Sequence, residues 1–182
     1  MEKIGMVERK TEPDIFGSLI SSIISQQIST VAASTVISRL TALCGSITPH
    51  DIMKIDVSAI QKCGMTMRKA EYIKDVTEKI VTGKFSLDKL PLLSDKEIIK
   101  VLVSLKGIGE WTAEMMLIHT FQRPDVLSYK DLGIRRGIMR LYELSEYSKK
   151  DHEVYKKRYS PYSTVASIYL WKISAKDYQE KN

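Results

Sequence analysis

Cysteine, proline, glycine and histidine are all scarce in this chain of 182 residues. The two cysteines, Cys44 and Cys63, form no CxxC pair, which excludes a disulfide framework and a cysteine-ligated metal site. The three histidines show no metal-ligand spacing either. No apolar run is long enough to cross a membrane, and the charged residues 1–10 do not look like a signal peptide. We therefore expect a cytosolic protein with reduced thiols.

Apolar and basic residues are plentiful by contrast. Hydrophobic residues make up 43% of the chain, which is enough for a proper core, and the length favours one large domain or two lobes that share a core. The formal net charge of +6 indicates a polyanionic partner.

Almost every segment has the apolar periodicity of a helix, and no strand hairpin or internal repeat is apparent. Ser94 and Glu97 fit a capping box, and Thr48-Pro49 and Ser160-Pro161 each fit a cap followed by a proline at the first helical position. The sequence thus predicts an all-α protein of two lobes, with its function in the cleft between them. The predicted helices span 13–24, 29–43, 49–54, 57–62, 67–82, 94–104, 110–121, 131–143 and 148–158, with one more from Ser160 onward.

The most informative segment is Leu105-Lys-Gly-Ile-Gly-Glu-Trp-Thr-Ala113. Gly107 and Gly109 allow a tight reversal with positive φ and a close approach by a ligand. The next helix starts near Glu110, and its first amides point outward with partial positive charge, which suits a phosphate beside Lys106. The alternative is a simple helix end and turn between two helices.

Asp131 follows this segment at the start of the next predicted helix. It fits an N-cap, and it also fits a carboxylate that does chemistry beside the hairpin. The two roles are compatible, because amides at a helix N-terminus stabilise a negative charge. In the helix that follows, Arg135, Arg136 and Arg140 are predicted to be available to solvent or phosphate.

Several segments resemble, in the same order along the chain, motifs of the helix-hairpin-helix (HhH-GPD) base-excision DNA glycosylases. The resemblance is greatest to the alkylation-repair 3-methyladenine glycosylase II branch. The segments are Ile24-Ser-Gln-Gln-Ile-Ser29, Lys69-Ala-Glu-Tyr-Ile73, Leu105–Ala113, Ser128-Tyr-Lys-Asp-Leu-Gly-Ile-Arg-Arg136 and Pro161–Trp171. The resemblance covers residues 13–173. It implies a single glycosylase core over 1–182 made of two helical lobes, with the hairpin motif at about 98–121 and no extra N-terminal β-domain.

The resemblance also implies a reaction. Such enzymes flip a damaged nucleotide out of double-stranded DNA and cut its N-glycosidic bond in base excision repair. Positive, oxocarbenium-like charge builds on the sugar, and Asp131 is the expected carboxylate that stabilises it. The lyase-competent branches have a lysine where this chain has Trp111, so we expect a monofunctional hydrolase. No iron–sulfur cluster is expected, because no cysteine follows Cys63.

The expected substrates are alkylated purines such as 3-methyladenine and 7-methylguanine, whose cationic bases an indole face attracts. The alternative for both tryptophans is a place in the core. The predicted pocket consists of Trp111, Trp171, Met115, Phe16 and Tyr129.

The resemblance further predicts the DNA contacts. Gln27 is expected to fill the gap left by the flipped base, with Gln26 and Ile28 beside it, although simple turn capping is the alternative. Backbone amides at Gly107 and Gly109 would bind a phosphate, with Lys106, Thr112 and Arg135 assisting. The main-chain carbonyls of Val103, Leu105 and Ile108 would hold a structural Na⁺ or K⁺.

We expect a monomer that binds damaged double-stranded DNA and no membrane, in the cytoplasm with the nucleoid or in a nucleus. Two alternatives remain open: a glycosylase for another lesion, and a non-catalytic helix-hairpin-helix DNA-binding protein. The basic segment 149–158 is interpreted as a solvated helix surface, because acidic residues are interspersed in it.

Overall fold

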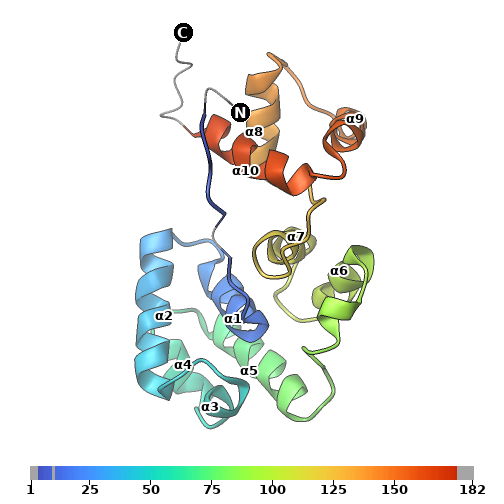
Figure 1. The fold of residues 1–182 in the computed structure, drawn as a ribbon. Helices are drawn as coiled ribbons and strands as arrows, with labels where there is room; N and C mark the ends of the chain where they lie inside the picture. The colour runs from blue at the N-terminus through green and yellow to red at the C-terminus, as the bar shows by residue number, and fades with distance from the viewer. Residues whose placement is uncertain (1–3, 10, 176–182) are drawn as a thin grey trace. The chain divides into compact units, whose positions relative to one another are not determined.

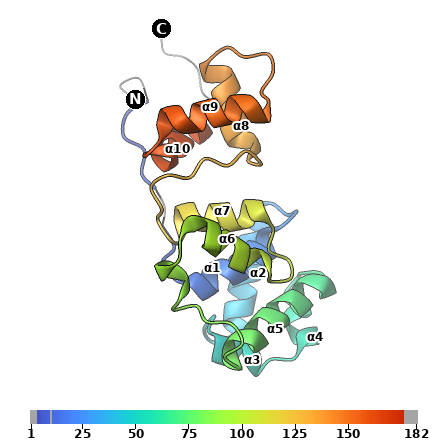
Figure 2. The same ribbon diagram turned by 90° about the vertical axis from the view of Figure 1, so that its right-hand side faces the viewer.

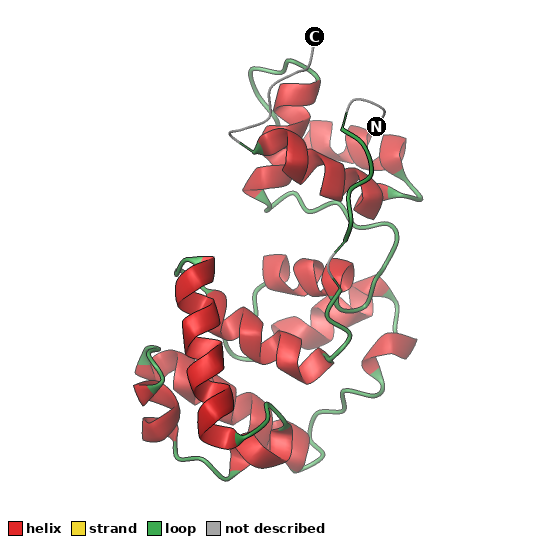
Figure 3. Ribbon diagram, turned by 60° about the vertical axis from the view of Figure 1, so that its left-hand side comes forward, coloured by secondary structure: helices red, strands yellow, loops and turns green. Residues whose placement is uncertain are grey.

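The structure is a computed structural model that describes residues 4–9 and 11–175. These residues form ten α-helices and one 3₁₀ helix, without a strand, which confirms the predicted all-α class (Figures 1 and 3). The elements are α1 (Ile15–Ser25), α2 (Thr30–Cys44), α3 (Pro49–Met53), α4 (Val57–Lys62), α5 (Met67–Val81), η1 (Leu90–Leu92), α6 (Asp95–Val103), α7 (Glu110–His119), α8 (Leu132–Leu141), α9 (Lys149–Tyr159) and α10 (Ser163–Ser174). None of these helices is long and apolar enough to span a bilayer.

The chain divides into two compact units. The hairpin unit comprises Glu12–Ala113, and the carboxylate unit comprises Met1–Thr11 with Glu114–Asn182. The boundary falls inside α7, so this helix contributes its first turn to one unit and the remainder to the other.

In the hairpin unit, α5 packs against α1, α3 and α4, and α1 also packs against α2 (Figure 2). The sequence sets the starts of these helices locally. Ser29, Thr48, Thr66 and Ser94 each accept a hydrogen bond from a first-turn amide, and Ser94 and Glu97 form the predicted capping box. Several isoleucine and leucine side chains without solvent exposure form the core: Leu19, Ile20, Ile23, Ile24, Leu40, Ile52, Ile60, Ile73, Ile98 and Leu102.

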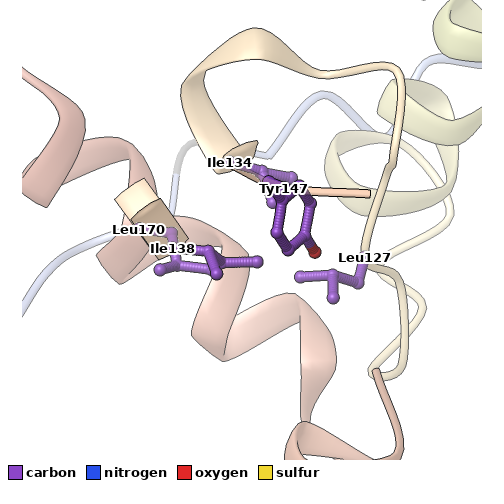
Figure 4. Packing of buried hydrophobic residues seen from close by; sticks show 5 residues of the cluster. All are labelled: Leu127, Ile134, Ile138, Tyr147 and Leu170. Carbon is purple, nitrogen blue, oxygen red and sulfur yellow. The ribbon is translucent and has the colours of Figure 1, made fainter. Parts of the chain in front are cut away.

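In the carboxylate unit, α8 and α10 form the main helix pair, and α9 packs on α10. Gly137 makes the close approach possible, because a Cβ at this position would overlap the Leu170 carbonyl oxygen. A buried apolar cluster joins the two helices to the preceding loop (Figure 4). Its members are Leu127, Ile134, Ile138, Tyr147 and Leu170.

His152 lies buried beside this cluster, although its helix α9 is largely polar. Its Nδ1 lies 2.9 Å from the Tyr147 hydroxyl, and its Nε2 lies 3.2 Å from the Leu127 carbonyl oxygen. Burial lowers the pKa of His152, despite the opposing contact with the Leu127 carbonyl.

The prediction of a helix start at Ser160-Pro161 was wrong. Ser160 ends α9 in an extended conformation, as is usual before proline, and α10 begins at Ser163. The reason lies far away in the sequence. Asp125 accepts hydrogen bonds from the Ser163 amide (3.2 Å), from the Ser163 hydroxyl and from the Ser160 hydroxyl (2.7 Å), so a distant loop fixes this helix start.

Candidate active site

Asp131 is the N-cap of α8, as the sequence predicted. Its Oδ1 accepts a hydrogen bond from the Ile134 amide at 2.8 Å, and the residue is only 7% exposed. A carboxylate this buried needs strong donors around it. The capping amide supplies one of them and fixes the carboxylate at the positive end of α8.

Trp171 supplies a second donor, which the sequence did not reveal. Its indole Nε1–H donates to the same Asp131 Oδ1 at 2.8 Å. Gly133 makes this contact possible, because a Cβ there would lie 2.7 Å from Trp171 Cδ1. The His119 ring stacks on the indole, with centroids 5.6 Å apart and planes 12° from parallel. Trp171 therefore orients the carboxylate, and one indole face is covered by His119.

The other predicted pocket residues differ in their exposure. Trp111 is 45% exposed in the first turn of α7, which suits a stacking surface, and Met115 on the same helix is half-buried. Phe16 is only 3% exposed on α1, which favours a core role. Tyr129 meets the His152 ring edge-on at 5.4 Å, and the Arg135 guanidinium lies 5.0 Å from its ring centroid. These contacts also favour a packing role for Tyr129.

The hairpin between α6 and α7 uses its two glycines differently. Gly107 has φ +84°, and a Cβ there would overlap the Tyr72 ring, so both its conformation and its packing require glycine. The prediction of positive φ at Gly109 was wrong, because its φ does not lie in the left-handed region. A Cβ on Gly109 would also meet nothing within 4 Å. Packing within the protein therefore does not require a glycine at residue 109. Its carbonyl oxygen accepts the first hydrogen bond of α7 from the Ala113 amide, which gives residue 109 the N-cap position, where glycine is preferred to alanine.

A cavity of about 400 Å³ lies beside the hairpin, entirely within the hairpin unit. Its lining includes two cationic side chains, several amide groups and no carboxylate, which suits an anion. The lining residues are Gln26, Gln27, Thr66, Arg68, Lys69, Tyr72, Gly107, Ile108 and Gly109. Sequence reasoning missed the contribution of α5 to this wall, although the Lys69–Ile73 segment had already been singled out.

The loop between α1 and α2 forms one edge of the cavity. Gln26 turns inward, and its Nε2 donates to the Gly107 carbonyl oxygen at 2.6 Å. Gln27 is exposed and has φ +59°, which is uncommon for a residue with a side chain, and Ile28 is 38% exposed. The geometry thus separates the roles of two adjacent glutamines. Gln26 ties the loop to the hairpin, and Gln27 is available to a ligand.

Three other predicted DNA contacts are already engaged within the protein. Lys106 is exposed but forms an ion pair with Asp75 (3.1 Å, Nζ to Oδ1). Thr112 is buried, and Arg135 is half-buried against Tyr129. Burial raises the pKa of Asp75, but the ammonium groups of Lys79 and Lys106 outweigh this effect and lower the pKa overall.

Arg140 is exposed to solvent, as predicted, and it also holds the end of α10. Its Nη1 donates to the carbonyl oxygens of Ile173 and Ala175, each at 3.1 Å, at the end of α10.

The monovalent cation at the carbonyls of Val103, Leu105 and Ile108 stays a prediction. The Leu105 oxygen accepts a hydrogen bond from the Ile108 amide at 3.2 Å. Within the described chain, no backbone hydrogen bond outside the helices ends on the carbonyl of Val103 or Ile108. Carbonyl groups at the negative end of a helix are suitable cation ligands.

The chain is all-helical, with a glycine hairpin, an adjoining cavity whose lining suits an anion, and a buried carboxylate at the next helix start. These features define the helix-hairpin-helix class. Comparison with known proteins defines it further. Residues 20–162 match the HhH-GPD superfamily of base excision DNA repair proteins. The chain belongs to this superfamily, as its sequence motifs indicated.

The individual relatives are consistent with this assignment. The DNA-3-methyladenine glycosylase 1 of Schizosaccharomyces pombe is 33% identical over 170 residues, which cover 91% of this chain and 74% of the relative. A crystal structure of a DNA-3-methyladenine glycosidase from Bacillus halodurans gives a TM-score of 0.84 at 38% identity and covers 93% and 80% of the two chains. A 3-methyladenine DNA glycosylase of S. pombe in complex with abasic DNA gives 0.82 at 31% identity and covers 98% and 91%.

Proposed function

We propose that this protein is a monofunctional DNA glycosylase that excises alkylated purines, of the 3-methyladenine and 7-methylguanine type, in base excision repair. The observation that carries the proposal is the Asp131 carboxylate, which is buried and held by the Ile134 amide and the Trp171 indole. Similarity to glycosylases named for 3-methyladenine supports the substrate class.

The chemistry follows from the charge that develops during cleavage. As the N-glycosidic bond breaks, the electron pair leaves with the base and the sugar becomes oxocarbenium-like. A carboxylate held in a fixed position stabilises this cation without having to reorganise. Water then adds to the sugar carbon and loses a proton, which leaves an abasic site and the free base. The two donors on Oδ1 keep the Asp131 carboxylate in one orientation for this step.

Trp111 supports both the monofunctional reaction and the choice of base. Its indole cannot form the Schiff base on which the lyase reaction depends. An alkylated purine carries positive charge on its ring, so contact with the Trp111 indole would attract it by about 0.5–2 kcal/mol more than a neutral base.

The hairpin unit would hold the DNA backbone. The amides near Gly109, at the start of α7, suit a phosphate, and the exposed Gln27 would fill the gap left by the extruded nucleotide. A Na⁺ or K⁺ on the carbonyls of Val103, Leu105 and Ile108 would neutralise the end of α6 next to that phosphate. We expect one protein molecule to act on one damaged duplex, wherever the cell keeps its DNA.

The test is the release of free base from methylated duplex DNA by wild type and by Asp131→Asn. Asparagine keeps an oxygen for the Ile134 and Trp171 donors and remains a good N-cap, so the variant changes the charge and little else. We expect wild type to release methylpurines and Asp131→Asn to lose at least about 100-fold in single-turnover rate. Duplex binding should persist and weaken steeply with salt.

Asp125→Asn is the matched control. Asp125 is another carboxylate of the same unit that accepts hydrogen bonds from a helix start, at Ser160 and Ser163. It should lose stability but retain base release. Equal activity in Asp131→Asn and wild type would refute the role of Asp131. No release of methylpurines by wild type would refute the substrate class.

A further inference from the structure

Helix α5 carries three side chains on one face that hold the hairpin and the loop between α1 and α2. Lys69, Tyr72 and Asp75 recur at a spacing of three residues, which places them along one side of a helix. Tyr72 fills the space beside Gly107, and Asp75 pairs with Lys106, so both of these residues support the hairpin. Lys69 instead reaches the loop between α1 and α2.

The contacts of Lys69 are short and specific. Its Nζ donates to the carbonyl oxygen of Ile24 at 2.7 Å and to that of Gln26 at 2.5 Å. These carbonyls belong to the end of α1, where backbone oxygens have no partner inside the helix. The ammonium group therefore closes the end of α1 just before Gln27, which adopts the uncommon φ of +59°.

Gln26 connects the same loop to the hairpin. Its side chain donates to the Gly107 carbonyl oxygen at 2.6 Å, while its own carbonyl accepts from Lys69. The loop is consequently fixed on two sides, by α5 through Lys69 and by the hairpin through Gln26. Together these contacts define where Gln27 and Ile28 lie relative to a phosphate bound at the hairpin.

We propose that Lys69 is a positioning residue for base extrusion: it holds the loop at Gln26–Ile28 in register with the hairpin through the Ile24 and Gln26 carbonyls. It does not touch the reacting atoms. Its effect passes through Gln27, which must enter the duplex while the hairpin grips the backbone. A loop released from Lys69 would still bind DNA through the hairpin but would extrude the damaged nucleotide less efficiently. This inference rests on the proposed glycosylase function.

Lys74 provides a matched control on the same helix. Its Nζ donates to the carbonyl oxygens of Met53 (2.8 Å) and Ile55 (2.9 Å), so it closes the end of α3 as Lys69 closes the end of α1. Lys74 does not line the cavity beside the hairpin. Lys69→Met and Lys74→Met remove the same charge and the same kind of contact, and only the first faces the loop.

The experiment measures thermal stability, affinity for undamaged duplex, and nucleotide extrusion, with 2-aminopurine placed beside the lesion as a fluorescent report of unstacking. We expect Lys69→Met to lose about tenfold or more in the extrusion step and in the single-turnover rate. Its affinity for undamaged duplex should fall by a smaller factor than its extrusion rate, because the Lys69 ammonium group is engaged by the Ile24 and Gln26 carbonyls and hairpin phosphate contacts dominate that binding. Lys74→Met should keep wild-type extrusion at a similar loss of melting temperature.

Gln26→Ala keeps the test decisive if Lys69→Met folds poorly. It removes the hydrogen bond from Gln26 to the Gly107 carbonyl, which is the other contact that holds the loop, and it should show the same loss of extrusion. Equal extrusion in Lys69→Met, Gln26→Ala and Lys74→Met would overturn the inference. If wild type unstacks the reporter but releases no base, the glycosylase proposal fails, and the comparison of extrusion between the variants still decides the role of Lys69.

Discussion

The two hairpin glycines should respond differently to the same substitution by alanine. Gly107 has φ +84° and faces the Tyr72 ring. Gly109 lacks a left-handed φ, and a Cβ added to it would have no atom within 4 Å. The same added methyl group therefore tests stability at residue 107 and DNA binding at residue 109.

The magnitudes follow from these geometries. At Gly107, a left-handed conformation costs a residue with a Cβ about 1–2 kcal/mol. The new Cβ would also lie about 2.9 Å from Tyr72 Cε2, and such overpacking costs about 1–3 kcal/mol more. Gly107→Ala should thus lose about 2–5 kcal/mol of stability. Gly109→Ala should change stability by less than about 1 kcal/mol, because the lower conformational freedom of alanine in the unfolded chain is opposed by the preference for glycine over alanine at an N-cap.

For stability Gly107→Ala is the more damaging substitution, whereas for DNA affinity Gly109→Ala should be the more damaging one. If a phosphate approaches the backbone at residue 109, the alanine methyl group would occupy its place, and Gly109→Ala should bind duplex at least about tenfold more weakly despite its stable fold. Urea unfolding measures the first quantity, and fluorescence anisotropy at a fixed salt concentration measures the second. Wild-type affinity in Gly109→Ala would refute the placement of DNA at this hairpin.

Three other predictions concern the base, the reaction and the core. Trp111→Leu should lower the preference for a cationic base over neutral hypoxanthine by about 2- to 30-fold, measured as a ratio of single-turnover rates, and an unchanged ratio would exclude cation–π selection. Wild type should form no covalent adduct with damaged DNA under borohydride, because Trp111 cannot form a Schiff base, and a trapped complex would contradict a monofunctional reaction. The pKa of His152 is lower in the folded protein, so the unfolded chain binds more protons, and stability should fall as pH drops below the ordinary value of 6.5. Urea unfolding from pH 7.5 to pH 5 measures this loss, which His152→Gln should abolish.

Local signals predicted most of the helices. The capping box at Ser94 and Glu97, and the caps at Thr48 and Asp131, lie where the sequence placed them. A cap contacts amides only two or three residues away, so the residues that decide the helix start are neighbours in sequence. Predicted and observed bounds differ by a few residues at several ends, where helices commonly fray.

Contacts between distant residues could not be predicted in the same way. The start of α10 depends on Asp125, 38 residues before Ser163, and the orientation of Asp131 depends on Trp171, 40 residues after it. Lys69 likewise meets the end of α1 across 43 residues or more. In each case a long or polar side chain satisfies a backbone or carboxylate group that only the tertiary fold brings near. No periodicity in the sequence encodes such a pairing.

Capping alone does not account for an aspartate at position 131. Asparagine caps a helix about as well, and its amide oxygen would accept from both Ile134 and Trp171. At 7% exposure, a carboxylate is more costly to bury than an amide, so a site under selection for stability alone would favour asparagine. Gly133 adds a second cost, since glycine is less favourable than alanine in a helix, by at most about 1 kcal/mol in the first turn, yet it admits the Trp171 indole to the carboxylate. Both costs are explained if the site must hold a negative charge in one fixed orientation, which is what stabilisation of an oxocarbenium-like sugar requires.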